Sequence, residues 1–283
     1  MWVNGACNGI AVRVARALTG PGSGAMDGCA GRSGTGRSRV WLGGLLWLVA
    51  GMAYGDSLKV AVAANFTAPM QKIAAIFEQQ TGQHLTLVFG GTGKFYAQIR
   101  NGAPFDVLLA ADQATAEKLV QQGLAQPDSR FVYATGRLVL WSAMPRRVDA
   151  AGNVLRSGDW QHLALANPQL APYGAAAMQV LDHMGLTAAL QPKLVRGEDI
   201  GQTWQFVASG NADLGFVAYS QVLRDGKPLP GSLWLVPANW YAPIRQEAVV
   251  LAAGKNNPAA GQLMRLLRSD AIRALIRSYG YGT

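Results

Sequence analysis

The segment LKVAVAANFTAPMQKIAAIFEQQTGQHLTLVF, residues 58–89, decides the fold class of this chain. Its first seven residues are almost all apolar, as in a strand that is buried on both faces of a sheet. Asn65, Thr67 and Pro69 then form a typical helix start, and apolar residues recur at helical spacing until Gly82. HLTLVF predicts a second strand. Strand, helix and strand with short loops predict a parallel βαβ unit with a right-handed crossover.

The same alternation continues along the rest of the chain. After GGTGK, a short helix is expected to end at Asn101-Gly102, and Asp112 offers its carboxylate as the cap of a helix that ends at Gly123. Further strands are expected at residues 107–111, 137–143, 163–166, 213–217 and 247–252, and further helices at residues 174–184, 200–209 and, as a pair, 259–278. This order predicts an α/β protein.

Two stretches divide the α/β region into two lobes. A connecting strand is expected near residues 131–136, and the chain returns near residues 237–243. We therefore place lobe I at residues 56–136 and 240–283, and lobe II at residues 137–239. The chain has 283 residues, of which 50% are apolar, so each lobe can bury a core of its own.

Residues 1–55 are interpreted as an N-terminal extension followed by a signal peptide. Residues 1–36 are rich in Gly, Ala, Arg and Ser without apolar periodicity, so no fold is expected there. Two arginines then precede VWLGGLLWLVAGMA, and small residues follow, a pattern typical of a secretory signal that is cleaved near Gly55-Asp56. The apolar run is shorter than the roughly 20 residues that span a bilayer, which disfavours the alternative of an uncleaved anchor.

The cleavage position also bears on where the mature protein is located. No cysteine stands there to carry a lipid, so we expect the mature protein to be free in an exported compartment. The start codon stays open, because the unusual stretch before Arg37 is compatible with translation from Met26 or later.

Charge and cysteine content argue against several classes of function. From residue 56 onward the chain has 20 basic and 15 acidic side chains, an excess that is weak evidence for a nucleic-acid partner and suits small anions. Cys7 and Cys29 both precede residue 56, so we expect no disulfide, thiolate nucleophile or cysteine-ligated metal in the folded part. The histidines His84, His162 and His183 have no metal-binding spacing.

Four loops carry the strongest functional signal. Each leads straight into a predicted helix, and they comprise residues 64–66, 91–93, 172–174 and 199–201. A helix start presents unpaired N–H groups and a partial positive charge, so several starts aimed at one point form an anion site without Arg or Lys. Because capped helix starts occur in every α/β protein, a purely structural role stays open for any single loop.

The loop FGGTGK does not fit a nucleotide site. A phosphate-binding P-loop needs glycine where Val88 stands and Ser or Thr where Phe95 stands, and the dinucleotide pattern needs a third glycine where Tyr96 stands. We expect Lys94 to be a solvated side chain of the first helical turn.

Four segments resemble the periplasmic molybdate-binding proteins that feed an ABC importer, namely VAVAANFTAPMQKIA, FGGTGKFYAQIRNGAPFDVLLAAD, LALANPQLAPYGAAAMQVLDHMG and GNADLGFVAYSQV. The likeness extends from about residue 58 to residue 281. It implies the two-lobed periplasmic-binding-protein fold of type II, with mixed, mostly parallel sheets and helices on both faces. It also implies a protein without cofactor or enzymatic activity that closes on molybdate or tungstate with neutral hydrogen-bond donors.

The resemblance further implies which residues bind the oxyanion. Asn65 matches the donor of the first loop, often a serine in the family, and Ala64 beside it gives a backbone contact. Thr92 matches a serine of the second loop that offers its hydroxyl and its N–H group. Tyr173 and Ile200 match residues that give their backbone N–H groups.

One position departs from the family pattern. Some members have a ligand-binding tyrosine after the buried strand, where this chain has Ala218, with Tyr219 one place later. Either the hydroxyl donor is lost and Asn65 compensates, or a local shift lets Tyr219 reach the site. A one-residue slip turns a strand side chain to the opposite face, which favours the first alternative.

The sequence therefore predicts an extracytoplasmic solute-binding protein, a monomer without nucleic-acid partner, that hands molybdate or tungstate to a membrane permease of an ABC transporter. A binder of sulfate, thiosulfate or phosphate is the alternative. An exported enzyme that acts on a phosphorylated substrate is disfavoured, because the candidates Asp106 and Asp112 have no partner base or nucleophile in the sequence pattern. The sequence does not separate molybdate from tungstate.

Overall fold

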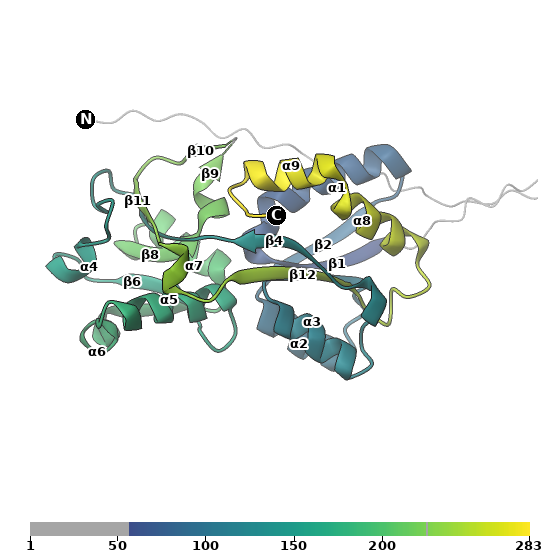
Figure 1. Cartoon of the computed structure of the whole chain (residues 1–283), viewed down its shortest axis with the longest axis horizontal. Coiled ribbons are helices and arrows are strands. Elements are labelled where there is room, and N and C mark those ends of the chain that lie inside the picture. The colour runs from purple at the N-terminus through teal and green to yellow at the C-terminus, as the bar shows by residue number, and fades with distance from the viewer. Residues whose placement is uncertain (1–56, 225) are drawn as a thin grey trace, which may run out of the picture. The chain divides into compact units, whose positions relative to one another are not determined.

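The computed structural model describes residues 57–224 and 226–283, which lie in one compact unit of the chain (Figure 1). The predicted N-terminal extension, signal peptide and cleavage position lie outside these residues. No helix in the described part is long and apolar enough to cross a membrane. Two five-stranded mixed sheets with helices on their faces confirm the predicted two-lobed α/β fold. Each sheet has two parallel and two antiparallel pairings, so the sheets are mixed but not mostly parallel.

The first lobe is built on a sheet with the strand order β2-β1-β3-β12-β4. β1 pairs in parallel with β2 and β3, whereas β12 pairs antiparallel with β3 and β4. The strands are β1 (Leu58–Ala63), β2 (Leu85–Gly90), β3 (Val107–Ala110), β4 (Phe131–Gly136) and β12 (Ile244–Val250). The helices are α1 (Thr67–Thr81), α2 (Thr92–Arg100), α3 (Gln113–Gln121), α8 (Pro258–Arg268) and α9 (Asp270–Ser278).

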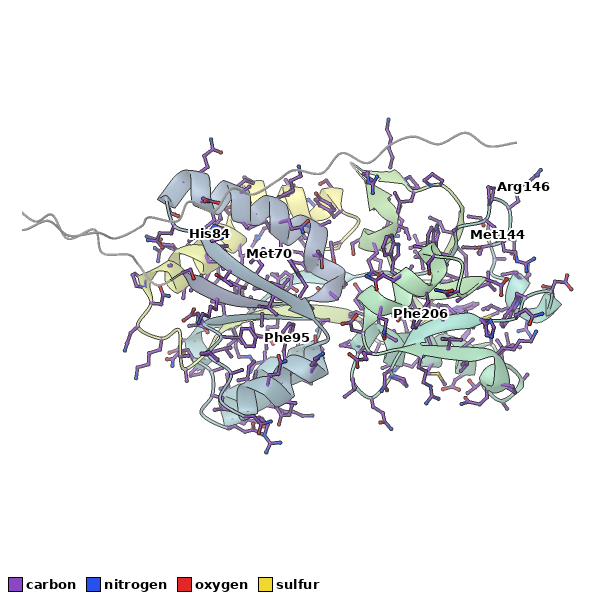
Figure 2. All side chains as sticks on the ribbon, turned by 180° about the vertical axis from the view of Figure 1, so that it is seen from behind. Met70, His84, Phe95, Met144, Arg146 and Phe206 are labelled. Carbon is purple, nitrogen blue, oxygen red and sulfur yellow. The ribbon has the colours of Figure 1, made fainter. Side chains whose placement is uncertain are left out.

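Both faces of this sheet are buried, as the apolar run of β1 predicts. Val60 and Val62 belong to the core with α1, α8 and α9, while Ala61 between them belongs to the core with α2 and α3. Figure 2 shows Met70 of α1 and Phe95 of α2 on opposite faces of the sheet. The alternation of a strand thus directs apolar side chains into both layers.

The second lobe is built on a sheet with the strand order β11-β5-β8-β6-β7. β6 pairs in parallel with β7 and β8, whereas β5 pairs antiparallel with β8 and β11. The strands are β5 (Leu138–Ser142), β6 (Leu163–Ala166), β7 (Leu194–Gly197), β8 (Leu214–Ala218) and β11 (Ser232–Leu235). The other elements are α4 (Val154–Ser157), α5 (Pro172–His183), α6 (Thr187–Leu190), α7 (Ile200–Ala208), β9 (Leu223–Arg224) and β10 (Lys227–Pro228).

Two connections carry the chain between the sheets. β4 leads to β5 through the single residue Arg137, and β11 leads back to β12 through residues 236–243. These are the places where the sequence predicts the crossings. The exact boundaries of the two lobes stay a prediction.

The structure also contains strands that the sequence pattern does not predict. β7 and β11 lie at the two edges of the second sheet, and most of their residues are only half-buried. Four residues at a sheet edge give neither a continuous apolar run nor a clear alternation, so the pattern misses them. β12 begins at Ile244, before the predicted start. The sequence pattern misses the first residues of this strand because polar Arg245 and Gln246 interrupt its apolar sequence.

Candidate functional site

The four loops predicted to form an anion site line a common cavity. The short helix η1 (Ala64–Phe66) follows β1, and α2, α5 and α7 begin at the same place. The cavity has a volume of about 10 Å³, far below the few hundred Å³ that organic ligands occupy. Its lining residues are Ala63, Ala64, Asn65, Gly90, Gly91, Thr92, Ala111, Ala171, Pro172, Tyr173, Asp199 and Ile200. The structure thus brings together all five residues predicted to bind the oxyanion.

α2 and α5 each begin at the cavity with a backbone N–H group that the helix itself cannot use. The first N–H groups of an α-helix have no carbonyl partner within the helix. In α2 the first N–H group belongs to Thr92. In α5 it belongs to Tyr173, because Pro172, the first residue of this helix, has no N–H group. Neither helix is capped by a side chain of its N-cap residue. Both N–H groups can therefore donate a hydrogen bond to a ligand in the cavity.

α7 reaches the same arrangement by a different route. The Asp199 carboxylate accepts the N–H groups of Gly201 at 2.8 Å and Gln202 at 3.0 Å. The cap leaves the N–H group of Ile200, the first residue of the helix, for another acceptor. Thr92 from the first lobe and Tyr173 and Ile200 from the second thus supply backbone donors to one cavity.

Thr92 also supplies a fixed hydroxyl group. Its side chain is 2% exposed, and Oγ1 accepts the N–H of Ala111 at 2.9 Å. Because this bond uses a lone pair of the oxygen, the hydroxyl hydrogen is left to donate elsewhere. The Ala111 N–H group therefore orients Thr92 as a donor.

Asn65 differs from the expectation in one respect. The residue is 2% exposed and lines the cavity, but its amide Nδ2 already donates to Gln246 Oε1 and to the Tyr281 hydroxyl, both at 2.9 Å. The amide oxygen Oδ1 is buried without a hydrogen-bond partner. In this orientation the side chain offers an acceptor, whereas the prediction requires a donor.

A buried polar network behind Asn65 was not predicted. Gln246 Oε1 accepts a hydrogen bond from the Tyr133 hydroxyl at 2.9 Å, and Gln246 Nε2 donates one to the Tyr173 hydroxyl at 3.1 Å. The Tyr281 hydroxyl donates to the Asn65 carbonyl at 2.7 Å. Burial raises the pKa of Tyr133, Tyr173 and Tyr281 above the ordinary value, so these hydroxyls stay protonated at neutral pH. The one sequence signal was Gln246, a polar residue beside an apolar strand run.

No Lys or Arg is among the described residues that line the cavity. Asp199, which does line it, has its carboxylate turned to the start of α7. Lys94 instead pairs with Glu198 at 3.6 Å, and both side chains are more than half exposed. The donors of the cavity are therefore uncharged, as predicted, and Lys94 is solvated, as predicted.

The lobes touch directly at the rim of this cavity. The Gly93 N–H group in α2 donates to the Leu170 carbonyl of the second lobe at 3.0 Å. The Lys94–Glu198 pair joins the same two lobes. The structure is thus a closed form.

Ala218 and Tyr219 do not line the cavity. The Tyr219 ring lies 5.3 Å from the guanidinium carbon of Arg137, and its backbone N–H donates to the Arg137 carbonyl at 2.9 Å. Ser220 instead contacts a site residue, because its hydroxyl donates a hydrogen bond to the Asn65 carbonyl at 2.9 Å. Of the two alternatives, this geometry favours loss of the tyrosine donor.

The two aspartates considered for catalysis have structural partners. Asp106 Oδ2 accepts the Lys59 N–H at 2.7 Å, and Asp112 Oδ1 accepts the Thr115 N–H at 2.6 Å as the cap of α3. The described residues contain no group of three or more His, Cys, Asp or Glu side chains that could hold a metal ion. The carboxylates of Asp106 and Asp112 therefore bind backbone N–H groups of β1 and α3.

Comparison with known proteins identifies the family. Residues 58–282 match the family of bacterial extracellular solute-binding proteins. The molybdate-binding protein ModA of Azotobacter vinelandii is 55% identical over 235 residues, which cover 83% of this chain and 93% of that protein. The ModA protein of Rhodobacter capsulatus is 48% identical over 242 residues, 84% of this chain and 94% of that protein. The chain belongs to the ModA family.

Solved structures agree with this assignment. The periplasmic molybdate-binding protein of Azotobacter vinelandii matches this ModA-family chain with a TM-score of 0.78 and 44% identity, over 80% of this chain and 99% of that one. The sulfate-binding protein SubI of Mycobacterium tuberculosis matches with a TM-score of 0.63 at 15% identity, over 80% of this chain and 86% of that one, a likeness of fold alone. The ModA-family chain therefore has the predicted periplasmic-binding-protein fold.

Proposed function

We propose that this protein is an extracytoplasmic solute-binding protein that captures molybdate or tungstate between its lobes and delivers it to an ABC importer. One observation carries the proposal: helix-start N–H groups of Thr92, Tyr173 and Ile200, from both lobes, surround one small cavity that no described Lys or Arg lines. Two relatives, which are 55% and 48% identical to this chain, are molybdate-binding proteins by name, and this supports the choice of oxyanion.

The chemistry of these donors suits a dianion. Removing a small dianion from water is costly, and charge-assisted hydrogen bonds of about 1.5 to 3 kcal/mol each offset this cost only when many converge. Closure of two lobes supplies that convergence. Donors held at fixed positions by helices and by Ala111 also discriminate by size, because a smaller oxyanion leaves some of the bonds stretched.

We extend the proposal to the location, assembly and partners of the protein. The protein acts in the periplasm after cleavage of its signal peptide near Gly55-Asp56, works as a monomer, needs no cofactor and catalyses no reaction. Its partner is the membrane permease of the transporter, and no nucleic acid takes part.

One observation favours a second candidate. The unpartnered Asn65 Oδ1 at the cavity would accept a hydrogen bond from an oxyanion that carries a proton, such as hydrogen phosphate. Fully deprotonated molybdate, tungstate and sulfate have no such proton. The orientation of one amide group therefore separates the two candidates.

A panel of oxyanions tests the proposal. Calorimetry and thermal unfolding of the purified protein with molybdate, tungstate, sulfate and phosphate should show tight binding and a raised melting temperature with the first two, because a ligand of the folded state stabilises it. At a hundred times Kd the stabilisation is about 2.7 kcal/mol. Comparable affinity for sulfate or phosphate would contradict the proposal.

A further inference from the structure

The Asn65 amide has the wrong atom free for the oxyanion that we propose. Its two amide hydrogens are used by Gln246 Oε1 and the Tyr281 hydroxyl, and its buried Oδ1 has no donor. An amide oxygen carries partial negative charge and repels a fully deprotonated dianion. A half-turn of the amide exchanges Oδ1 and Nδ2 and would direct an N–H group to that position.

Asn65 cannot make this turn alone. After the turn its Oδ1 would lie where Nδ2 now lies, 2.9 Å from Gln246 Oε1, and two acceptors would face each other without a hydrogen between them. Asn65 is 2% exposed and Gln246 is fully buried, so bulk solvent does not reach the pair to relieve the conflict. The orientation of Asn65 therefore depends on the orientation of Gln246.

A joint turn of both amides removes the conflict. Gln246 Nε2 would then donate to Asn65 Oδ1 and to the Tyr133 hydroxyl, which has the Ala110 carbonyl at 3.3 Å as its own acceptor. Gln246 Oε1 would accept the hydroxyl of Tyr173, which now accepts from Nε2 at 3.1 Å. The same heavy-atom positions thus support a second complete set of hydrogen bonds.

The remaining members of the network also accept the turn. The Tyr281 hydroxyl, 2.9 Å from the amide of Asn65, would donate to Oδ1 instead of accepting from Nδ2. The Asn65 carbonyl keeps a donor, because the Ser220 hydroxyl lies 2.9 Å away. In this second set no buried polar atom of Asn65 is left without a partner once the anion is bound.

We propose that Gln246 is the positioning residue that determines whether Asn65 presents an acceptor or a donor to the cavity, and that both amides turn over together when a fully deprotonated dianion binds. This inference rests on the proposed function. Gln246 lies on β12 of the first lobe and contacts Tyr173 of the second, so the selection takes place only when the lobes are closed. Discrimination against protonated oxyanions follows from it.

A double-mutant cycle tests the coupling. Gln246→Met keeps the length of the side chain but can neither donate nor accept, and Asn65→Ser replaces the amide by a hydroxyl that rotates freely. With Asn65 present, Gln246→Met should weaken molybdate binding by at least about tenfold, since a charge-assisted bond is lost. In the Asn65→Ser background the same change should cost less than about threefold, because a hydroxyl needs no orienting partner.

Gln246→Glu provides a second variant that retains the packing. A carboxylate accepts from Asn65, Tyr133 and Tyr173 without donating, so it holds Asn65 in the acceptor orientation. We expect the unliganded protein to fold and molybdate binding to fall further than phosphate binding. Gln179→Met is the matched control, because Gln179 accepts the Ala242 N–H at 2.7 Å outside the cavity lining, and its molybdate affinity should stay within about twofold of wild type.

The outcomes separate this inference from the function on which it rests. Failure of the wild type to bind molybdate would overturn both. If the wild type binds molybdate and Gln246→Met costs as much in the Asn65→Ser background as in the wild-type background, only the role of Gln246 is overturned. An unchanged preference for molybdate over phosphate in Gln246→Glu would likewise overturn only the role of Gln246.

Discussion

Thr92 is the residue whose geometry most clearly prepares it for a ligand. The Ala111 N–H group engages its oxygen at 2.9 Å and leaves its hydrogen for the cavity. Thr92→Ala should weaken molybdate binding by about 1 to 3 kcal/mol, the cost of a lost hydrogen bond to a charged group, and Thr92→Ser should recover most of it. Calorimetry measures both variants.

Thr81→Ala is the matched control for this prediction. The Thr81 hydroxyl donates to the Phe77 carbonyl at the end of α1, away from the cavity lining. Its affinity for molybdate should equal that of the wild type. If Thr92→Ala bound as tightly as this control, the assignment of the second loop would be wrong.

The buried tyrosines make stability sensitive to alkali. Burial raises the pKa of Tyr133, Tyr173 and Tyr281 above the unfolded value of about 10. Their contribution to stability is therefore complete below pH 10 and is lost as the pH rises above it, by about 1.4 kcal/mol per pH unit for each group. Urea unfolding across this range should show a shallower slope for Tyr281→Phe than for the wild type, and parallel slopes would exclude the buried network as the cause.

At this scale the sequence predicted the residues of the cavity but not the network behind it. The four loops that hold Asn65, Thr92, Tyr173 and Ile200 could be found because they lie between strands and helices, a position that points to ligands, and the family resemblance indicated the individual residues. Gln246 and Tyr133 lie inside strands and Tyr281 lies near the chain end, and only the folded arrangement brings them together. The roles of all these residues toward the ligand stay predictions.

Among the elements, β4 ends at a position where the lobes approach closely. A Cβ atom on Gly136 would overlap the Tyr173 hydroxyl oxygen and would lie 2.9 Å from Gln246 Nε2. Gly136→Ala should therefore oppose closure and weaken molybdate binding by at least about tenfold, or 1.4 kcal/mol. Small-angle scattering with molybdate should show a larger radius of gyration than for the wild type.

Gly261→Ala serves as the control for this change. A Cβ on Gly261 of α8 would meet only the flexible end of Arg265, at 3.5 Å. Closure and affinity should be unaffected. Normal closure of Gly136→Ala would show that the contact with Tyr173 does not define the closed form.

β12 is also held by a largely buried ion pair. Arg130 contacts both carboxylate oxygens of Glu247 at 3.0 Å, and this bonding raises the pKa of the guanidinium. Arg130→Met leaves the carboxylate of Glu247, whose side chain is 5% exposed, without its partner and should lower the free energy of unfolding by about 2 to 3 kcal/mol. Urea unfolding at neutral pH checks this value.

The exposed pair between Lys94 and Glu198 is the comparison for Arg130. Lys94→Met should change the free energy of unfolding by less than about 1 kcal/mol, because solvent screens the pair. Equal effects of the two substitutions would contradict the assignment of β12 stability to Arg130.

Elements with strong periodicity were predictable, and short edge strands were not. The run of β1 and the cap of α3 by Asp112 follow local rules, so both could be recognised before the fold was known. β7 and β11 owe their place to pairing with β6 and β5, a tertiary contact that four half-buried residues do not reveal.

For the whole molecule, we propose that closure of the two lobes brings neutral donors from both of them around one oxyanion. The order of strands and helices predicted two lobes, and the loops at the strand ends predicted where a ligand lies. The sequence could not reveal that Lys94 pairs with Glu198 across the rim of the cavity, because the two residues lie on different lobes.

A crystal structure of the molybdate complex would show whether the donors of both lobes surround the anion. We predict that the anion lies in the cavity, with its oxygens about 2.7 to 3.0 Å from Thr92 Oγ1 and from the backbone nitrogens of Tyr173 and Ile200. An anion outside this cavity, or one held chiefly by lysine and arginine side chains, would contradict the account.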